Sequence, residues 1–358
     1  MEKRRFRLAE YTHGGDILSA KARYGGEILD FSANLNPLGM PGAVRAAARA
    51  AVDGCVHYPD PLCRELTAAI AARDRVEPGQ ILCGNGAADL IFRLAIALRP
   101  ARALVTAPTF SEYAQALGAV GTQVFSHRLY AKENFDLTER VLEELTPGLD
   151  VFFLCSPNNP TGRRVRAPLM EQILHQCGEN RILLVVDECF LSLSDGAGPG
   201  LAPRLAENPR LLLLRAFTKS YAIPGLRLGY CLSADGALLE RLSLCGQPWS
   251  VSGAAQAAGV AAMGCPQWPE EARKLIQTER SWLLEQMSAL NLKTWPGEAN
   301  YLLFQAPGRG DLKERLLEWG ILVRSCANYE GLGPDFYRIA VRPHGENERL
   351  ISALKEVL

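Results

Sequence analysis

Seven short apolar runs, separated by stretches with helical periodicity, make up the middle of the chain. The runs lack polar alternation and end in turn-forming residues, which is typical of strands buried on both faces. They cover Gln80–Cys83, Ala103–Thr106, Val124–His127, Val151–Cys155, Ile182–Val186, Leu211–Arg215 and Leu228–Ser233. Helical patterns lie between several of them, at Ala87–Leu98, Glu112–Ala119 and Leu169–Cys177. This alternation predicts an α/β fold with a mostly parallel sheet covered on both faces.

The pattern changes after Pro269, where short strands mix with helices. The expected elements are Glu270–Leu290, Asn300–Gln305, Asp311–Trp319, Ile321–Arg324, Tyr337–Val341 and Glu346–Leu358. They predict a smaller α+β unit at the C-terminus. The segment up to Arg49 is compatible with packing on either unit, and its composition does not decide between them.

Composition narrows the function classes. The chain has 358 residues, enough for about two domains. With 48% hydrophobic and 22% charged residues, it is expected to be globular. Its 39 basic and 39 acidic residues cancel, which removes the usual electrostatic reason to expect a nucleic-acid or membrane partner, although a local basic pocket remains compatible.

Cysteine, histidine and targeting patterns point to an ordinary cytoplasmic protein. Ten cysteines are too dilute for a disulfide scaffold, and the five histidines lack metal-site spacings, so we expect no metal. The N-terminus has no apolar signal region. The charge-free stretch Leu242–Pro269 is rich in Gly, Ala and Ser, so we expect a buried helix there instead of a membrane span.

Two glycines mark the first candidate site, at the turn between a strand and a helix. Gly84 and Gly86 would let a ligand approach the first N–H groups of the helix, which favour a phosphate. The dinucleotide pattern GxGxxG is not met, because Asp89 occupies its last position. Considered alone, this loop is more typical of an ordinary turn than of a phosphate site.

Two further candidates follow the next strands. Asn159, in PNNPTG, lies between prolines and suits a donor aimed at a cofactor oxygen, although the segment is also a plausible plain turn. Asp187 ends an apolar strand, and a buried carboxylate requires a partner. A protonated ring nitrogen of a cofactor, an arginine, or the N-terminus of a helix that it caps would each stabilise this carboxylate.

Lys219 gives the most specific signal. It follows a strand and lies between Phe217 and Tyr221, where its pKa would be lowered and its amine would suit Schiff-base chemistry. Arg227, eight residues later, suits a bidentate phosphate contact. The alternatives are a surface lysine and a structural arginine.

The order of these residues along a parallel sheet predicts a pocket for pyridoxal 5′-phosphate. Asp187 would hold the ring nitrogen protonated, and Lys219 would carry the cofactor. Asn159 would bond the ring 3-oxygen. The phosphate would be held by Arg227 and by the helix start at Gly86, Ala87 and Ala88. Phe110 would stack on the ring, and Thr218 is included among the cofactor contacts.

These motifs resemble the fold-type I, aspartate-aminotransferase-like family of pyridoxal-phosphate enzymes over nearly the whole chain. NNPTG, VVDE and TKSYAIPGLRLGY carry the resemblance. Within the family, the chain looks like the L-threonine-O-3-phosphate decarboxylases more than the histidinol-phosphate aminotransferases. The segments that favour this are HGGDI, LDFSANLNPLGMP, PWSVSGAAQ, ANYLL and ILVRSCANYEGL.

The resemblance implies a large cofactor-binding domain with a mixed, mostly parallel sheet over residues 50–245. The small domain would combine an N-terminal arm, residues 1–49, with residues 246–358. It also implies a homodimer in which Tyr58 reaches the cofactor phosphate of the neighbouring subunit.

The resemblance also implies a substrate and its anchors. Arg338 would hold the α-carboxylate of an amino acid phosphate, and Asn159 would face the substrate as well as the cofactor. The residues expected at the substrate phosphate are Arg324, His13, Gly14 and Asn34. The implied reaction is decarboxylation of O-phospho-L-threonine to (R)-1-aminopropan-2-yl phosphate for cobalamin biosynthesis.

Three positions depart from the common family pattern. Ala216 stands where a Ser or Thr commonly touches the cofactor phosphate, at a loss of about 1 kcal/mol. The phosphate loop reads GNGAAD instead of a GNGETE-like form, so backbone N–H groups must make that contact. Phe190 replaces a Tyr that is usual in the aminotransferases and leaves the ring 3-oxygen without that partner.

Four alternatives remain at this stage. A histidinol-phosphate aminotransferase would use the same anchors, and a decarboxylase preferring O-phospho-L-serine differs by one methyl group in the substrate. A non-catalytic binding module is disfavoured by the presence of Lys219, Asp187 and Arg227. A nicotinamide-dependent dehydrogenase is disfavoured by Asp89 in the glycine loop. The sequence does not choose between decarboxylation and transamination.

Overall fold

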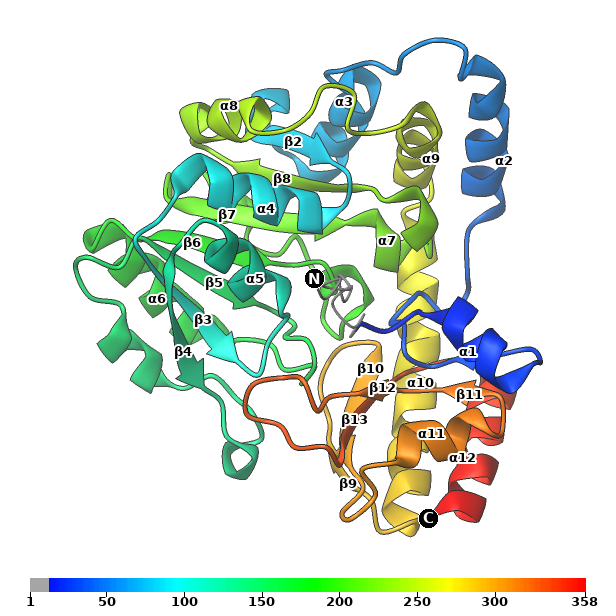
Figure 1. Cartoon of the computed structure of the whole chain (residues 1–358). Helices are drawn as coiled ribbons and strands as arrows, with labels where there is room; N and C mark the ends of the chain where they lie inside the picture. The colour runs from blue at the N-terminus through cyan, green and yellow to red at the C-terminus, as the bar shows by residue number, and fades with distance from the viewer. Residues whose placement is uncertain (1–12) are drawn as a thin grey trace, which may run out of the picture.

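The computed structural model describes residues 13–358, and its largest element is a seven-stranded sheet with the order β2-β8-β7-β6-β5-β3-β4 (Figure 1). The strands are β2 Ile81–Gly84, β3 Arg102–Ala107, β4 Gln123–Arg128, β5 Val151–Cys155, β6 Leu183–Asp187, β7 Leu211–Ala216 and β8 Gly229–Ser233. β8 runs antiparallel to β7 and β2, and the other paired strands are parallel. The predicted α/β fold is confirmed, and each predicted strand is present to within one residue at either end.

Helices cover both faces of this sheet because alternate strand residues point to opposite faces. On β5, Phe153 packs in the core that holds Leu94 and Tyr113, whereas its neighbour Phe152 packs in the core that holds Ile70. The first face is covered by α4 Ala87–Leu98, α5 Glu112–Ala119 and α8 Gly236–Leu244. The second is covered by α3 Arg64–Asp74, α6 Ala167–Glu179 and α9 Gly253–Met263. Burial on both faces explains the continuously apolar strands.

A second unit is built on a four-stranded antiparallel sheet with the order β12-β13-β10-β9. Its strands are β9 Lys293–Trp295, β10 Tyr301–Gln305, β12 Arg324–Ser325 and β13 Phe336–Ala340. The helices α10 Gln267–Ala289, α11 Leu312–Leu317 and α12 His344–Val357 share a core with it. In Figure 1, α10 runs from beside α7 down along this smaller sheet. The predicted C-terminal α+β unit is confirmed.

The N-terminal segment joins the smaller unit before it reaches the larger one. β1 Leu29–Asp30 pairs in parallel with β11 Ile321–Leu322, and Ala20 of α1 Ile17–Tyr24 shares a small core with Leu317. The chain then continues to α2 Gly42–Ala50, which packs against α9 (Figure 1). The division at residues 1–49, 50–245 and 246–358 stays a proposal.

The charge-free stretch Leu242–Pro269 does not form the single buried helix that we expected. It holds the end of α8 with the exposed Leu244, a loop with the exposed Trp249, the 11-residue helix α9, and the first residues of α10. Small residues suit α9 because it is closely packed: a Cβ on Gly259 would lie 2.6 Å from Leu228 Cδ2. Within residues 13–358, no helix combines the length and the apolar character needed to cross a membrane.

Candidate active site

Asp187 lies at the carboxyl end of β6, in register with Cys155 at the end of β5. It is buried, and its Oδ2 accepts a 2.6 Å hydrogen bond from the Tyr113 hydroxyl while its Oδ1 accepts one of 2.9 Å from the Cys189 N–H. Burial and the neighbouring Asp187 charge hold the pKa of Tyr113 well above its usual value, so Tyr113 remains a donor. No Arg or Lys of residues 13–358 forms an ion pair with Asp187, and the arginine alternative is therefore wrong.

Tyr113 was not among the predicted site residues. It lies on α5, three residues after Phe110, and the two rings pack edge to face with centroids 5.6 Å apart. Its place in the first turn of the helix that follows β3 was the available signal. The Tyr113 hydroxyl holds the Asp187 carboxylate in place through its hydrogen bond, and the Phe110 ring packs against the Tyr113 ring.

Lys219 lies in the short helix α7, Phe217–Ser220, immediately after β7. It is largely buried, and burial followed by the positive charge of Arg338 lowers its pKa to about 8. Asn36 holds this turn from the N-terminal segment: its N–H donates to the Lys219 carbonyl at 3.0 Å, and its Nδ2 donates to the Ser220 carbonyl at 2.8 Å. The surface-lysine alternative is wrong, and Asn36 is a second residue that sequence reasoning missed.

The glycine turn and Arg227 form a cradle at the start of α4. Gly86 has φ +82°, and a Cβ there would lie 2.7 Å from Arg227 Nη2. A Cβ on Gly229 would lie 2.6 Å from the backbone nitrogen of Ala87. The first N–H groups of a 12-residue helix therefore lie beside a guanidinium that makes no ion pair within the described part of the chain. This arrangement suits a phosphate.

Asn159 and Arg338 meet although 179 positions separate them. Arg338 Nη1 donates to Asn159 Oδ1, which also accepts from the Tyr329 hydroxyl at 3.3 Å. Because the carbonyl oxygen is engaged, the Asn159 amide NH₂ is the group left to donate to a ligand. Arg338 Nη2 donates to the Ser32 carbonyl at 2.7 Å.

The Arg338 guanidinium is buried and incompletely satisfied. Its Nε has no hydrogen-bond partner, and no carboxylate among residues 13–358 pairs with it. A buried cation without a counter-charge is costly. A carboxylate ligand would satisfy both the open N–H and the charge.

Arg324 lines a second, net cationic cavity of about 880 Å³, which includes space open to solvent, together with His13, Arg23, Lys313 and the acidic Asp16. Arg324 Nη1 donates to the Ser325 carbonyl at 2.6 Å, and its Nη2 donates to Asn328 Oδ1 at 2.7 Å.

The predicted phosphate contacts of the N-terminal segment lie close by. A Cβ on Gly14 would lie 2.2 Å from the Ser32 oxygen, which is the acceptor for Arg338. Asn34 is buried, and neither polar atom of its side chain has a hydrogen-bond partner in the part of the chain that the structure describes. Both polar ends of this amide are therefore open to a ligand.

Three further residues from the sequence analysis, Thr218, Phe190 and Tyr58, differ in how deeply they are buried. Thr218 is buried in α7, and Phe190 packs edge to face on Tyr301 with ring centroids 5.0 Å apart. Tyr58 is 79% exposed and stacks on Trp249 with centroids 4.4 Å apart, so this chain alone does not bring it to the other site residues.

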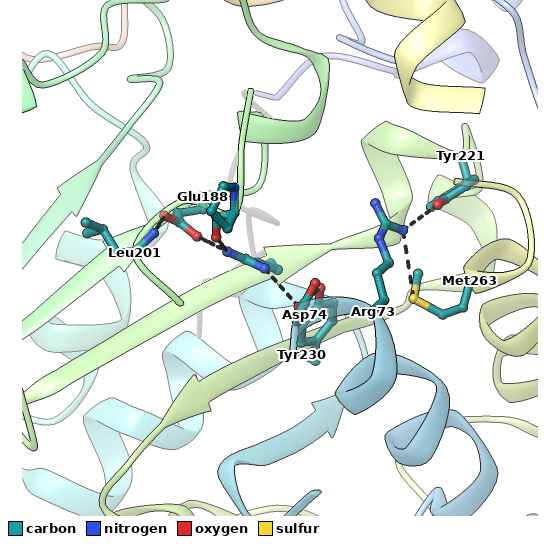
Figure 2. Close-up of polar contacts among 9 residues, drawn as sticks. Arg73, Asp74, Glu188, Leu201, Tyr221, Tyr230 and Met263 are labelled. Carbon is teal, nitrogen blue, oxygen red and sulfur yellow. Dashed lines mark hydrogen bonds and ion pairs between the residues drawn. The ribbon is translucent and has the colours of Figure 1, made fainter. Parts of the chain in front are cut away.

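A network of buried ion pairs and hydrogen bonds connects the ends of β6 and β7 near the site (Figure 2). Arg215 pairs with Glu188 at 2.7 Å and with Asp74 at 2.8 Å. Tyr230 donates to Asp74 at 2.7 Å, and the Leu201 N–H donates to Glu188 at 2.8 Å. Since Glu188 follows the last residue of β6 and Arg215 is on β7, the network ties together the strands that carry the acid and the lysine.

Comparisons with known proteins agree with this geometry. A family described as aminotransferase class I and II matches residues 26–355. A threonine-phosphate decarboxylase of Salmonella typhimurium is 41% identical over 356 residues, covering 98% of each chain. The adenosylcobalamin biosynthesis bifunctional protein CobDQ of Leptospira interrogans is 29% identical over 96% of this chain and 41% of its own length. The crystal structure of a histidinol-phosphate aminotransferase from Clostridium acetobutylicum superimposes with TM-score 0.86 at 25% identity, over 92% of this chain and 99% of that one.

Proposed function

The chain belongs to the class I and II aminotransferase family, and on this premise we propose that it is a pyridoxal-phosphate-dependent decarboxylase of O-phospho-L-threonine. The product would be (R)-1-aminopropan-2-yl phosphate, for cobalamin biosynthesis. Identity of 41% over 98% of the chain with a threonine-phosphate decarboxylase supports the activity, and the CobDQ relative supports the pathway. The structural observation that carries the proposal is the pair of buried guanidinium groups, Arg338 and Arg324, without carboxylate partners among the described residues.

The residues present fit pyridoxal phosphate. Asp187 would hold the ring nitrogen, Lys219 would carry the cofactor through Nζ, and Asn159 would donate its amide to the ring oxygen. The phosphate would be held by Gly86, Ala87, Ala88, Thr218 and Arg227, with Phe110 against the ring. When bound, the cofactor supplies an acceptor for the electron pair left on Cα after one of its bonds breaks.

The two arginines would orient the substrate and so select the bond that breaks. Arg338 would hold the α-carboxylate, and Arg324 would hold the phosphate with help from His13, Gly14 and Asn34. If the two arginines present the bond between Cα and the carboxylate for cleavage, the carboxylate would be lost as CO₂. Holding the Cα–H bond in that position would favour transamination.

Lys219 is suited to return a proton to Cα. With a pKa lowered to about 8, its Nζ can give up and regain a proton near neutral pH. One proton taken up at Cα balances the loss of CO₂. Arg338 therefore has two effects, since it holds the carboxylate and its charge also lowers the pKa of Lys219.

A histidinol-phosphate aminotransferase remains the second candidate, because the superposition with such an enzyme has TM-score 0.86. Both activities need an anion site for a phosphate ester. The test is a substrate panel on one preparation of cofactor-loaded protein: O-phospho-L-threonine, O-phospho-L-serine, and histidinol phosphate with 2-oxoglutarate. Catalytic CO₂ release from the first, without amino transfer from the third, is expected; the reverse would overturn the proposal. Faster CO₂ release from O-phospho-L-serine would identify that compound as the preferred substrate, and the reaction would still be a decarboxylation.

A homodimer with Tyr58 contributed to the neighbouring site belongs to the same proposal. Tyr58 and Trp249 stack at the surface beside other exposed apolar side chains, Val52, Val56 and Leu62. Exposed apolar groups of this kind favour association. Light scattering should give twice the monomer mass of 39.1 kDa. A cytoplasmic location is proposed as well, because all ten cysteines are free thiols.

A further inference from the structure

Glu112 is a buried carboxylate that the proposed reaction has not used. It is the first residue of α5, two positions after Phe110, and it is 8% exposed. Its Oε1 lies 2.7 Å from His13 Nε2, while its Oε2 is buried and has no hydrogen-bond partner among residues 13–358. A glutamate in the first turn does not need to be buried to stabilise a helix. Burial with an unsatisfied oxygen is costly, so helix capping does not account for it.

The contact joins the N-terminal segment to the large domain at the site. His13 precedes Gly14, whose backbone lies against Ser32 too closely for a Cβ. The Gly15 N–H donates to Ser32 Oγ at 2.7 Å, and the Ser32 carbonyl accepts from Arg338 at 2.7 Å. Residues 13–15 therefore contact Glu112 through His13. Through Gly15 they also contact Ser32, which is the acceptor of the Arg338 hydrogen bond.

His13 lies between Glu112 and the cationic cavity. It lines the 880 Å³ cavity with Arg324, and its ring centroid is 6.4 Å from that of Phe110. A carboxylate in close contact with one ring nitrogen, here at 2.7 Å, limits the positions that the imidazole ring can take. A bare carboxylate at the same place would repel a phosphate. Because His13 separates the two anions, the imidazole can contact a substrate phosphate only in the orientation that Glu112 sets.

We propose that Glu112 is a positioning residue that acts through His13 to select phosphorylated amino acids. The inference rests on the proposed function, since it deepens the substrate specificity of the same site. Glu112 itself need not touch the substrate. Its removal should affect recognition of the phosphate group and leave recognition of the α-amino acid group unchanged.

The test is a double-mutant cycle on the cofactor-loaded protein with E112Q, H13A and the double variant. KM and kcat are measured for CO₂ release, and dissociation constants for O-phospho-L-threonine and for L-threonine are measured by titration calorimetry with the same substitutions in the K219A background, which should not turn over the substrate. The matched control is E144Q, which breaks another histidine–glutamate contact, His127 Nδ1 to Glu144 Oε1 at 2.6 Å, elsewhere in the fold. Retention of cofactor absorbance verifies that each variant is folded and loaded.

E112Q should raise the dissociation constant and KM for O-phospho-L-threonine roughly tenfold, leave kcat within about twofold, and leave L-threonine binding unchanged. The double variant should bind no more weakly than H13A, because Glu112 acts through that ring. E144Q should match the unmodified protein. Equal losses for both ligands, or additive effects of the two substitutions, would overturn the inference.

The outcome is separable from that of the proposed function. If O-phospho-L-threonine binds with the expected coupling but releases no CO₂, the decarboxylase proposal fails and the role of Glu112 stands. If CO₂ is released and the substitutions are additive, the role of Glu112 fails alone. If O-phospho-L-threonine does not bind, the same cycle with histidinol phosphate decides the role of Glu112.

Discussion

Replacing Arg215 with methionine should destabilise the protein strongly. The guanidinium is 12% exposed and pairs with Asp74, whose side chain is 8% exposed, and with Glu188, whose side chain is 4% exposed. Methionine keeps much of the length but leaves two carboxylates buried without a cation. Removing one partner of a buried ion pair costs about 3–5 kcal/mol. The Tyr230 and Leu201 hydrogen bonds remain, so we expect a loss near the lower end of that range.

The assay is urea unfolding of the cofactor-loaded protein, with the free energy of unfolding compared between variants. R128M is the matched control, because Arg128 pairs with Glu330 at the surface, where the side chains are 43% and 57% exposed. An exposed pair contributes less than about 1 kcal/mol. The triple variant D74N/E188Q/R215M should recover most of the loss, since it removes the two unpaired charges.

The variant should also lose cofactor more readily. Glu188 directly follows the last residue of β6, and Arg215 lies four positions before Lys219, so the network fixes the distance between the two strand ends. The reasoning is refuted if R215M is no less stable than R128M, or if the triple variant is as unstable as R215M alone.

Four other results are expected. Y113F should lower kcat/KM about 10- to 100-fold, because Asp187 loses a charge-assisted hydrogen bond; an unchanged value would contradict this role. Attachment of added pyridoxal phosphate to the apo-protein should accelerate as pH rises through about 8, where Lys219 becomes a neutral amine. R338M should move that midpoint to higher pH, since a positive neighbour is lost; a shift to lower pH would be the wrong sign. N34A should weaken binding of O-phospho-L-threonine about tenfold. Unfolding should change little because Asn34 makes no side-chain hydrogen bond in the described chain, and a large loss of stability would show a structural role.

The strands of the large sheet could be predicted closely because they are buried on both faces. Each forms a continuous apolar run that ends at a turn, and β5 Val151–Cys155 has the predicted bounds. The direction of β8 was not evident from its own residues. The connection agrees with the antiparallel direction: the twelve residues between Ala216 and Gly229 are at the lower limit for a parallel crossover, and they form the four-residue helix α7 and a short turn instead of a covering helix.

One predicted strand proved to serve two sheets. Ile321–Arg324 looks like a single run, but the structure divides it at Val323. β11 pairs with β1, whereas β12 pairs with β13. The pairing partners lie about 290 residues upstream and 14 residues downstream, and a local pattern carries no information on such a choice.

The site was predictable as far as its residues follow strand ends. Asp187, Lys219 and the glycine turn could be found because parallel strands end at one edge. Tyr113, Glu112 and Asn36 were missed, since each acts on a residue far away in the chain. The roles of Tyr58 and of the other site residues stay predictions.

The most direct test of the central claim is CO₂ release from carboxyl-labelled O-phospho-L-threonine, incubated with the cofactor-loaded protein and no keto acid. The account predicts many turnovers per subunit, one aminopropyl phosphate for each CO₂, and no turnover by K219A. It also predicts that R338M loses most of the rate. Absence of labelled CO₂, with amino transfer from histidinol phosphate by the same preparation, would contradict the account and assign the two arginines to an aminotransferase.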